Sequence, residues 1–143
     1  MNNMNFINKI GSFYPINLVA NNSHNAFYIN YETLPNTSAI GFYMVLAGLQ
    51  IHKVFTVNLI ITADDNRIVV NTKNTVVTDE LPEDNLIKEK GLTSGTFTIS
   101  PKPFDIPDGV HTYLATAILE DTDGNIWDNA TTWFVTRPDP SKN

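Results

Sequence analysis

Residues 104–136 decide the fold of this chain, and they read FDIPDGV HTYLATAILE DTDGN IWDNATTWFVT. Pro107, Asp108 and Gly109 are typical turn residues, and residues 110–119 follow as a β-type run. Residues 121–125 have the Asp, Gly and Asn content of a tight hairpin turn, and residues 126–136 form a second β-type run. The stretch therefore predicts a turn, a strand, a hairpin turn and a last strand that close an all-β domain.

Composition limits the classes of protein to consider. The chain has 143 residues, no cysteine and a formal net charge of −6. This length suits one domain with its own core. The absence of cysteine excludes disulfides, thiolate metal sites and a thiol nucleophile. The acidic balance argues against nucleic acid and anionic membranes as partners, because both need a basic face.

The chain organisation predicts a single domain at residues 7–137, with flexible ends at 1–6 and 138–143. The N-terminus has no basic segment followed by an apolar run, so we expect no classical signal peptide. The longest apolar run, residues 39–49, is too short to cross a bilayer. We therefore expect a soluble protein that is cytoplasmic or virion-associated.

Short alternating runs separated by turn residues predict the strands. Residues 11–20, 26–32, 53–62, 67–71 and 95–100 fit this pattern, and 75–78 fits a short strand. Residues 39–47 are apolar on both faces and predict a buried strand, with Phe42, Met44 and Leu46 toward the core. Alternation predicts the inward residues of the neighbouring runs as Phe55, Val57, Leu59 and Ile61, and as Phe97 and Ile99. The turn at residues 64–66 predicts an inserted hairpin, and the acidic residues 79–90 predict a surface crossover between two sheets.

The C-terminal stretch resembles bacterial immunoglobulin-like domains. The resemblance rests on Pro107-Asp108-Gly109, on the small residues that alternate along 110–117, and on the turn at 121–125 that ends in Gly124-Asn125. It implies an antiparallel β-sandwich of about 7–9 strands. It implies little about function, because such sandwiches serve many roles.

The densest acidic cluster contains Asp121, Asp123, Asn125 and Asp128. Its start resembles an EF-hand loop, but positions 6 and 12 of such a loop would be Ile126 and Thr132 in place of Gly and Glu. We therefore expect a hairpin turn, with a weak Ca²⁺ site at Asp121, Asp123 and Asn125 as the alternative.

No catalytic constellation is found in the sequence. The histidines, His24, His52 and His111, lie in separate segments without metal-ligand spacing. The acidic residues of 79–90 lack an apolar pocket that would raise one carboxyl pKa. We expect no enzyme activity, no cofactor and no structural metal.

One apolar face is predicted as an interface. If the third, penultimate and last strands share a sheet, its outer face presents apolar side chains from all three. The predicted interface residues are Tyr43, Val45, Leu114, Ile118 and either Trp133 or Phe134. The alternative is that residues 51–90 fold over this face and cover it.

These observations favour a non-enzymatic protein-interaction or assembly module of bacterial or phage origin, which associates with itself or docks a protein. The alternative is a sandwich that binds a carbohydrate or small ligand by stacking on Trp127 and Tyr43, with Ca²⁺ as a possible ligand of the hairpin turn.

Overall fold

The computed structural model describes residues 6–18 and 26–142, and it is nearly all β. The described residues contain ten strands, and two of them, which are only three residues long, are not predicted from the sequence. The strands are β1 (Lys9–Ile16), β2 (Tyr28–Tyr31), β3 (Asn36–Ser38), β4 (Gly41–Gln50), β5 (Val54–Ala63), β6 (Ile68–Val77), β7 (Leu92–Ile99), β8 (Phe104–Ile106), β9 (His111–Asp121) and β10 (Ile126–Pro138). Short 3-10 turns follow β6 at η1 (Thr78–Glu80) and η2 (Glu83–Asn85), and η3 (Pro140–Lys142) follows β10.

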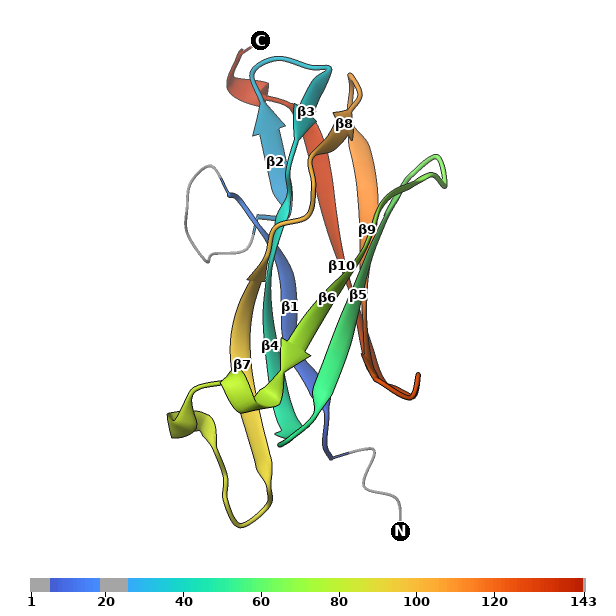
Figure 1. The fold of residues 1–143 in the computed structure, drawn as a ribbon. Coiled ribbons are helices and arrows are strands. Elements are labelled where there is room, and N and C mark those ends of the chain that lie inside the picture. The colour runs from blue at the N-terminus through green and yellow to red at the C-terminus, as the bar shows by residue number, and fades with distance from the viewer. Residues whose placement is uncertain (1–5, 19–25, 143) are drawn as a thin grey trace.

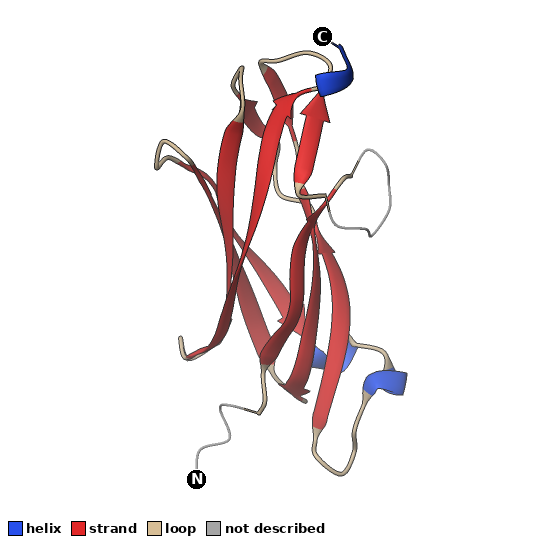
Figure 2. Ribbon diagram, turned by 180° about the vertical axis from the view of Figure 1, so that it is seen from behind, coloured by secondary structure: helices blue, strands red, loops and turns tan. Residues whose placement is uncertain are grey.

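Two sheets face each other and form the predicted immunoglobulin-like β-sandwich (Figures 1 and 2). One sheet has the order β1-β4-β7, and the other has the order β2-β10-β9-β5-β6. A two-stranded ladder, β3-β8, lies at the end of the sandwich where β10 ends, and β1 begins at the opposite end (Figure 1).

The core fills the space between the sheets with alternate residues of each strand. From the three-stranded sheet it takes Phe42, Met44 and Leu46, and from β5 it takes Phe55 to Ile61 in steps of two. Phe42 meets Phe134 of β10 with ring centroids 6.1 Å apart, and Phe134 stacks on Tyr113 of β9. The inward residues predicted for the strands at 39–47 and 53–62 are therefore confirmed.

The inserted hairpin and the acidic crossover are both present, but they cover neither sheet. Strand β5 pairs with both β9 and β6, so the hairpin widens the larger sheet in its own plane. The crossover carries η1 and η2 and lies beside β7 (Figure 1). There the Asn85 side chain donates to the Ser94 carbonyl at 3.0 Å. The alternative that residues 51–90 fold over an outer face does not hold for β5 and β6, because the alternation along these strands suits pairing within a sheet.

One pairing departs from the antiparallel pattern. Strand β2 joins the larger sheet next to the last strand and runs parallel to it, with Tyr28 opposite Val135. Strand β2 is therefore an edge strand of this sheet, next to β10, and β1 stays in the smaller sheet opposite. Among the described residues, none of the helical segments has the length and apolarity that a bilayer crossing needs.

Candidate interaction surface

The outer face of the five-stranded sheet carries a transverse line of apolar side chains. The register places Trp133 of β10 opposite Leu114 of β9, and Leu114 opposite Thr62 of β5. Their neighbours Phe134, Tyr113 and Ile61 point into the core, so these three point outward. Thr62 in turn lies opposite Ile68, at a bulge where β6 begins.

Four large apolar side chains along this line are exposed. The exposed fractions are 58% for Tyr28, 42% for Trp133, 48% for Leu114 and 62% for Ile68. We call these four residues the apolar row. An exposed apolar line across several strands differs from scattered surface residues, because it offers continuous contact to one partner.

One end of the row is held in place by aromatic and polar contacts. The Tyr28 and Trp133 rings meet edge to face, 5.9 Å apart at 86°. The Arg137 guanidinium lies 5.1 Å from the centre of the Tyr28 ring, and its Nε donates to Asn30 Oδ1 at 2.8 Å. These contacts preorganise two aromatic side chains of the kind that dominates binding energy at interfaces.

On the side away from the β5–β6 turn, the surroundings of the row are polar and carry little charge. The two outward rows below it in the register join Thr131, Thr116, Ile60 and Asn71, and then Asn129, Ile118, Asn58 and Lys73. Lys73 is the only charged residue in these two rows. An apolar centre with a polar rim is an arrangement that protein interfaces share.

The predicted interface residues therefore do not all share one face. Leu114, Ile118 and Trp133 lie together on the outer face of the larger sheet, although Ile118 is half-buried. Tyr43 and Val45 lie in β4 of the other sheet, because β4 pairs with β1 and β7 and not with the last two strands. Phe134 is fully buried, so Trp133 is the outward residue of the pair.

Two residues of the row, Tyr28 and Ile68, are not among the interface residues predicted from the sequence. The alternation of Ile29 and Tyr31 as inward residues is a signal that Tyr28 points outward. No local signal shows that β2 lies beside β10, because that pairing joins residues more than a hundred positions apart.

The hairpin turn at residues 121–125 is built by Asp121. Its carboxylate accepts hydrogen bonds from the Asp123 and Asn125 backbone N–H groups, from the Asn125 side chain and from Trp127 Nε1 at 3.0 Å. The bond from the Trp127 indole, followed by the Asn125 bonds, lowers the pKa of Asp121 to about 2. The carboxylate thus serves the turn as expected, and these donors compete with any cation for its oxygens.

Trp127 is not the exposed platform that the carbohydrate alternative requires. It is half-buried and packs against the core at a bulge in β10, where its neighbour Asp128 accepts a hydrogen bond from the Ile10 backbone N–H of the other sheet at 2.8 Å.

Across the described residues, no group of three or more His, Asp or Glu side chains is placed to hold a metal ion. His24 lies outside the described residues, and His52 pairs with Asp79 on the surface.

The sequence matches no protein-family model and no curated protein. Its fold is similar to part of a glycosyl hydrolase family 2 member from Bacteroides cellulosilyticus DSM 14838, with a TM-score of 0.60 and 9% identity over 88% of this chain and 15% of that chain. It is also similar to part of Bacteroides uniformis β-glucuronidase, with a TM-score of 0.55 and 8% identity over 69% of this chain and 11% of that chain. A third match is Bacteroides uniformis β-glucuronidase 2 covalently bound to cyclophellitol-6-carboxylate aziridine, with a TM-score of 0.53 over the same shares.

At these identities the likeness shows the fold alone. The chain spans between 11% and 15% of the length of these enzymes. It therefore resembles one β-sandwich part of each of them.

Proposed function

We propose that this chain is a non-enzymatic interaction domain that docks a second copy of itself through the outer face of its five-stranded sheet. The observation that carries the proposal is the apolar row, in which four large exposed side chains cross the sheet together. Burial of such side chains contributes about 25 cal/mol per Å² of apolar surface.

Charge favours a second copy as the partner. Two copies of a chain with net charge −6 repel each other over most of their surface. The apolar row and the two outward rows below it contain no acidic residue. Contact between two copies over these three rows therefore brings no carboxylates together, and Asp64 and Asp65 lie beyond the row at the β5–β6 turn.

The alternative of sugar stacking has less support. A sugar-binding platform needs aromatic rings that are exposed and roughly coplanar, so that they match the apolar face of a pyranose ring. The Trp127 indole donates a hydrogen bond to Asp121, and the exposed rings of Tyr28 and Trp133 stand at 86° to each other, so they are not coplanar.

Light scattering coupled to size-exclusion chromatography tests the proposal over a range of protein concentrations. The wild-type mass should rise with concentration from 16.0 kDa toward twice that value. Leu114→Glu places a charge in the row and should weaken association about thirtyfold or more, the loss typical of a central interface residue. Ile126→Glu is the matched control, because Ile126 is 55% exposed at the β9–β10 hairpin and lies outside the row.

Circular dichroism should show that both variants keep the wild-type fold. A wild-type protein that stays monomeric at the highest concentration would overturn self-association. Equal weakening by Ile126→Glu would show that contact is made elsewhere.

A further inference from the structure

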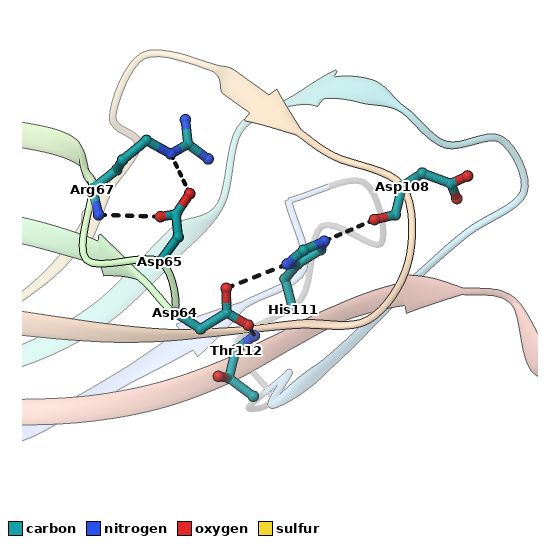
Figure 3. Close-up of polar contacts among 6 residues, drawn as sticks. All are labelled: Asp64, Asp65, Arg67, Asp108, His111 and Thr112. Carbon is teal, nitrogen blue, oxygen red and sulfur yellow. Dashed lines mark hydrogen bonds and ion pairs between the residues drawn. The ribbon is translucent and has the colours of Figure 1, made fainter.

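A histidine joins two turns at the end of the sandwich where β10 ends. His111 is the first residue of β9, and Asp64 follows directly after β5 in the β5–β6 turn. Asp108 belongs to the turn that leads from β8 into β9. Figure 3 shows the His111 ring lying between Asp64 and Asp108, with a contact to each.

Both ring nitrogens of His111 face hydrogen-bond acceptors. Nδ1 lies 3.3 Å from a carboxylate oxygen of Asp64, and Nε2 lies 2.7 Å from the backbone carbonyl oxygen of Asp108. Neutral imidazole carries one N–H group, so it can donate to one of these partners and must turn a lone pair toward the other. The imidazolium form satisfies both contacts, so the geometry selects the charged ring.

The charges around the ring agree with this assignment. Asp64 and Asp65 face it from the β5–β6 turn, but the Asp65 carboxylate pairs with Arg67, and the Asp108 carboxylate points away from the ring (Figure 3). Tyr113 follows on β9, and its phenol is neutral at physiological pH, since burial raises its pKa further above the ordinary value of 10.0.

Two pKa directions follow from these contacts. The Asp108 carbonyl, followed by the Asp64 carboxylate, raises the pKa of His111. The Thr112 backbone N–H, which donates to the second oxygen of Asp64 at 2.9 Å, is the main cause of the lowered pKa of Asp64.

We propose that His111 is a proton-operated latch that ties the β5–β6 turn to the turn before β9. The charged ring holds Asp64 on one side and the Asp108 carbonyl on the other. When the ring loses a proton, the shorter contact with Asp108 keeps the remaining N–H, and the Nδ1 lone pair then faces the Asp64 carboxylate. The latch therefore opens on the Asp64 side, where the Thr112 N–H is the remaining bond to Asp64, and the β5–β6 turn is loosened.

The two latched segments also border a crevice of about 640 Å³. Arg67 lines it from the β5–β6 turn, and Asp105, Ile106 and Pro107 line it from β8 and the residue after it. Loosening of the β5–β6 turn would free one wall of this crevice, so a proton on His111 controls its shape.

Nuclear magnetic resonance tests the latch by following the ring signals of His111 against pH. The midpoint should lie above that of an unfolded-chain histidine and should fall in Asp64→Asn, which keeps the shape of Asp64 without its charge. Asp79→Asn is the matched control, because Asp79 pairs with His52 at the opposite end of the sandwich and should leave the His111 midpoint unchanged.

Hydrogen exchange supplies a second readout. Protection of the Thr112 amide, corrected for the intrinsic effect of pH, should fall about fivefold as pH rises and His111 loses its proton. This loss corresponds to a hydrogen bond of about 1 kcal/mol. In His111→Gln the protection should not change across the same pH range. A His111 midpoint that ignores Asp64→Asn, or Thr112 protection that stays constant through the titration, would overturn the proposal.

Discussion

The outer faces of the two sheets differ although both obey the same alternation. On the three-stranded sheet the outward aromatic residues, Tyr14 and Tyr43, lie opposite each other on adjacent strands and stack with ring centroids 5.0 Å apart at 29°. Both are half-buried, and β1, β4 and β7 contain no large exposed apolar residue. On the five-stranded sheet, Tyr28, Trp133, Leu114 and Ile68 remain exposed.

The difference shows how outward apolar residues avoid or keep contact with water. On the smaller sheet the tyrosine pair is flanked by short side chains such as Ser12, Thr96 and Thr98, and the two rings cover one another. On the wider sheet the apolar residues stand side by side in a line that is too long for any one ring to cover. The wide face is therefore left with apolar surface that a partner can bury.

The largest expected effect on the free energy of unfolding is the difference between an inward and an outward residue of β10. Phe134→Ala should lower the free energy of unfolding by about 3–5 kcal/mol, because the ring is fully buried between Phe42 and Tyr113. Trp133→Ala, one residue away, should lower it by no more than about 1 kcal/mol, because its ring is 42% exposed. Urea unfolding of both variants measures the difference, and similar losses would mean that the outer face is also a core.

Local alternation explains which part of the fold the sequence predicts and which part it does not. A period of two fixes which side chains of one strand share a face, so Phe42, Met44 and Leu46, or Phe97 and Ile99, are predicted as inward residues. It does not say which sheet a strand joins. The strand at residues 39–47 is predicted in the sheet of the last two strands, and the structure places it in the opposite sheet.

The same limit applies to the candidate surface. Leu114 and Trp133 can be predicted because they lie on two consecutive strands joined by a tight hairpin. Tyr28 cannot be added, since its place beside Trp133 depends on a parallel pairing between distant segments. The sequence also suggests an exposed Trp127, because a bulge, which shifts the alternation by one residue, has no clear local signal.

A smaller loss of stability is expected from the contact between Asp121 and Trp127, the residue that the bulge turns inward. Asp121→Ala removes the acceptor of the Trp127 indole and should lower the free energy of unfolding by about 1 kcal/mol or somewhat more. Fluorescence in a Trp133→Phe background, which leaves Trp127 as the remaining tryptophan, should shift toward that of a solvated indole. An unchanged spectrum would mean that packing alone holds Trp127.

The pKa of Asp121 adds a pH test of the same contact. Because this pKa is depressed to about 2 in the folded protein, the stabilisation is present above the ordinary carboxyl pKa of 3.8 and is lost as pH falls toward 2. The difference in unfolding free energy between wild type and Asp121→Ala should therefore shrink over that window. A difference that stays constant down to pH 2 would assign the loss to the missing side chain and not to its charge.

A double-mutant cycle on the smaller sheet tests whether its tyrosines cover each other. Tyr14→Ala, Tyr43→Ala and the double variant should give a coupling of about 0.5–1.5 kcal/mol, the range of stacked aromatic pairs. Strictly additive losses would mean that the two rings do not shield one another from water. In the light-scattering experiment, Tyr43→Ala should associate like wild type, since Tyr43 lies on the opposite side of the sandwich from the apolar row.

The smallest effect concerns the end of the row at Tyr28. Arg137→Gln removes the guanidinium from the Tyr28 ring and the bond from Nε to Asn30, and it should lower the free energy of unfolding by about 0.5–1 kcal/mol. Its effect on association should be larger than this, because the Tyr28 and Trp133 rings lose the contact that fixes their perpendicular arrangement. Arg137→Lys separates the two roles, since it keeps the charge over the ring and lacks the planar group that reaches Asn30. If Arg137→Gln weakens association and Arg137→Lys associates like wild type, the charge over the ring orders this end of the row. If neither variant changes association, the strands alone order the two rings.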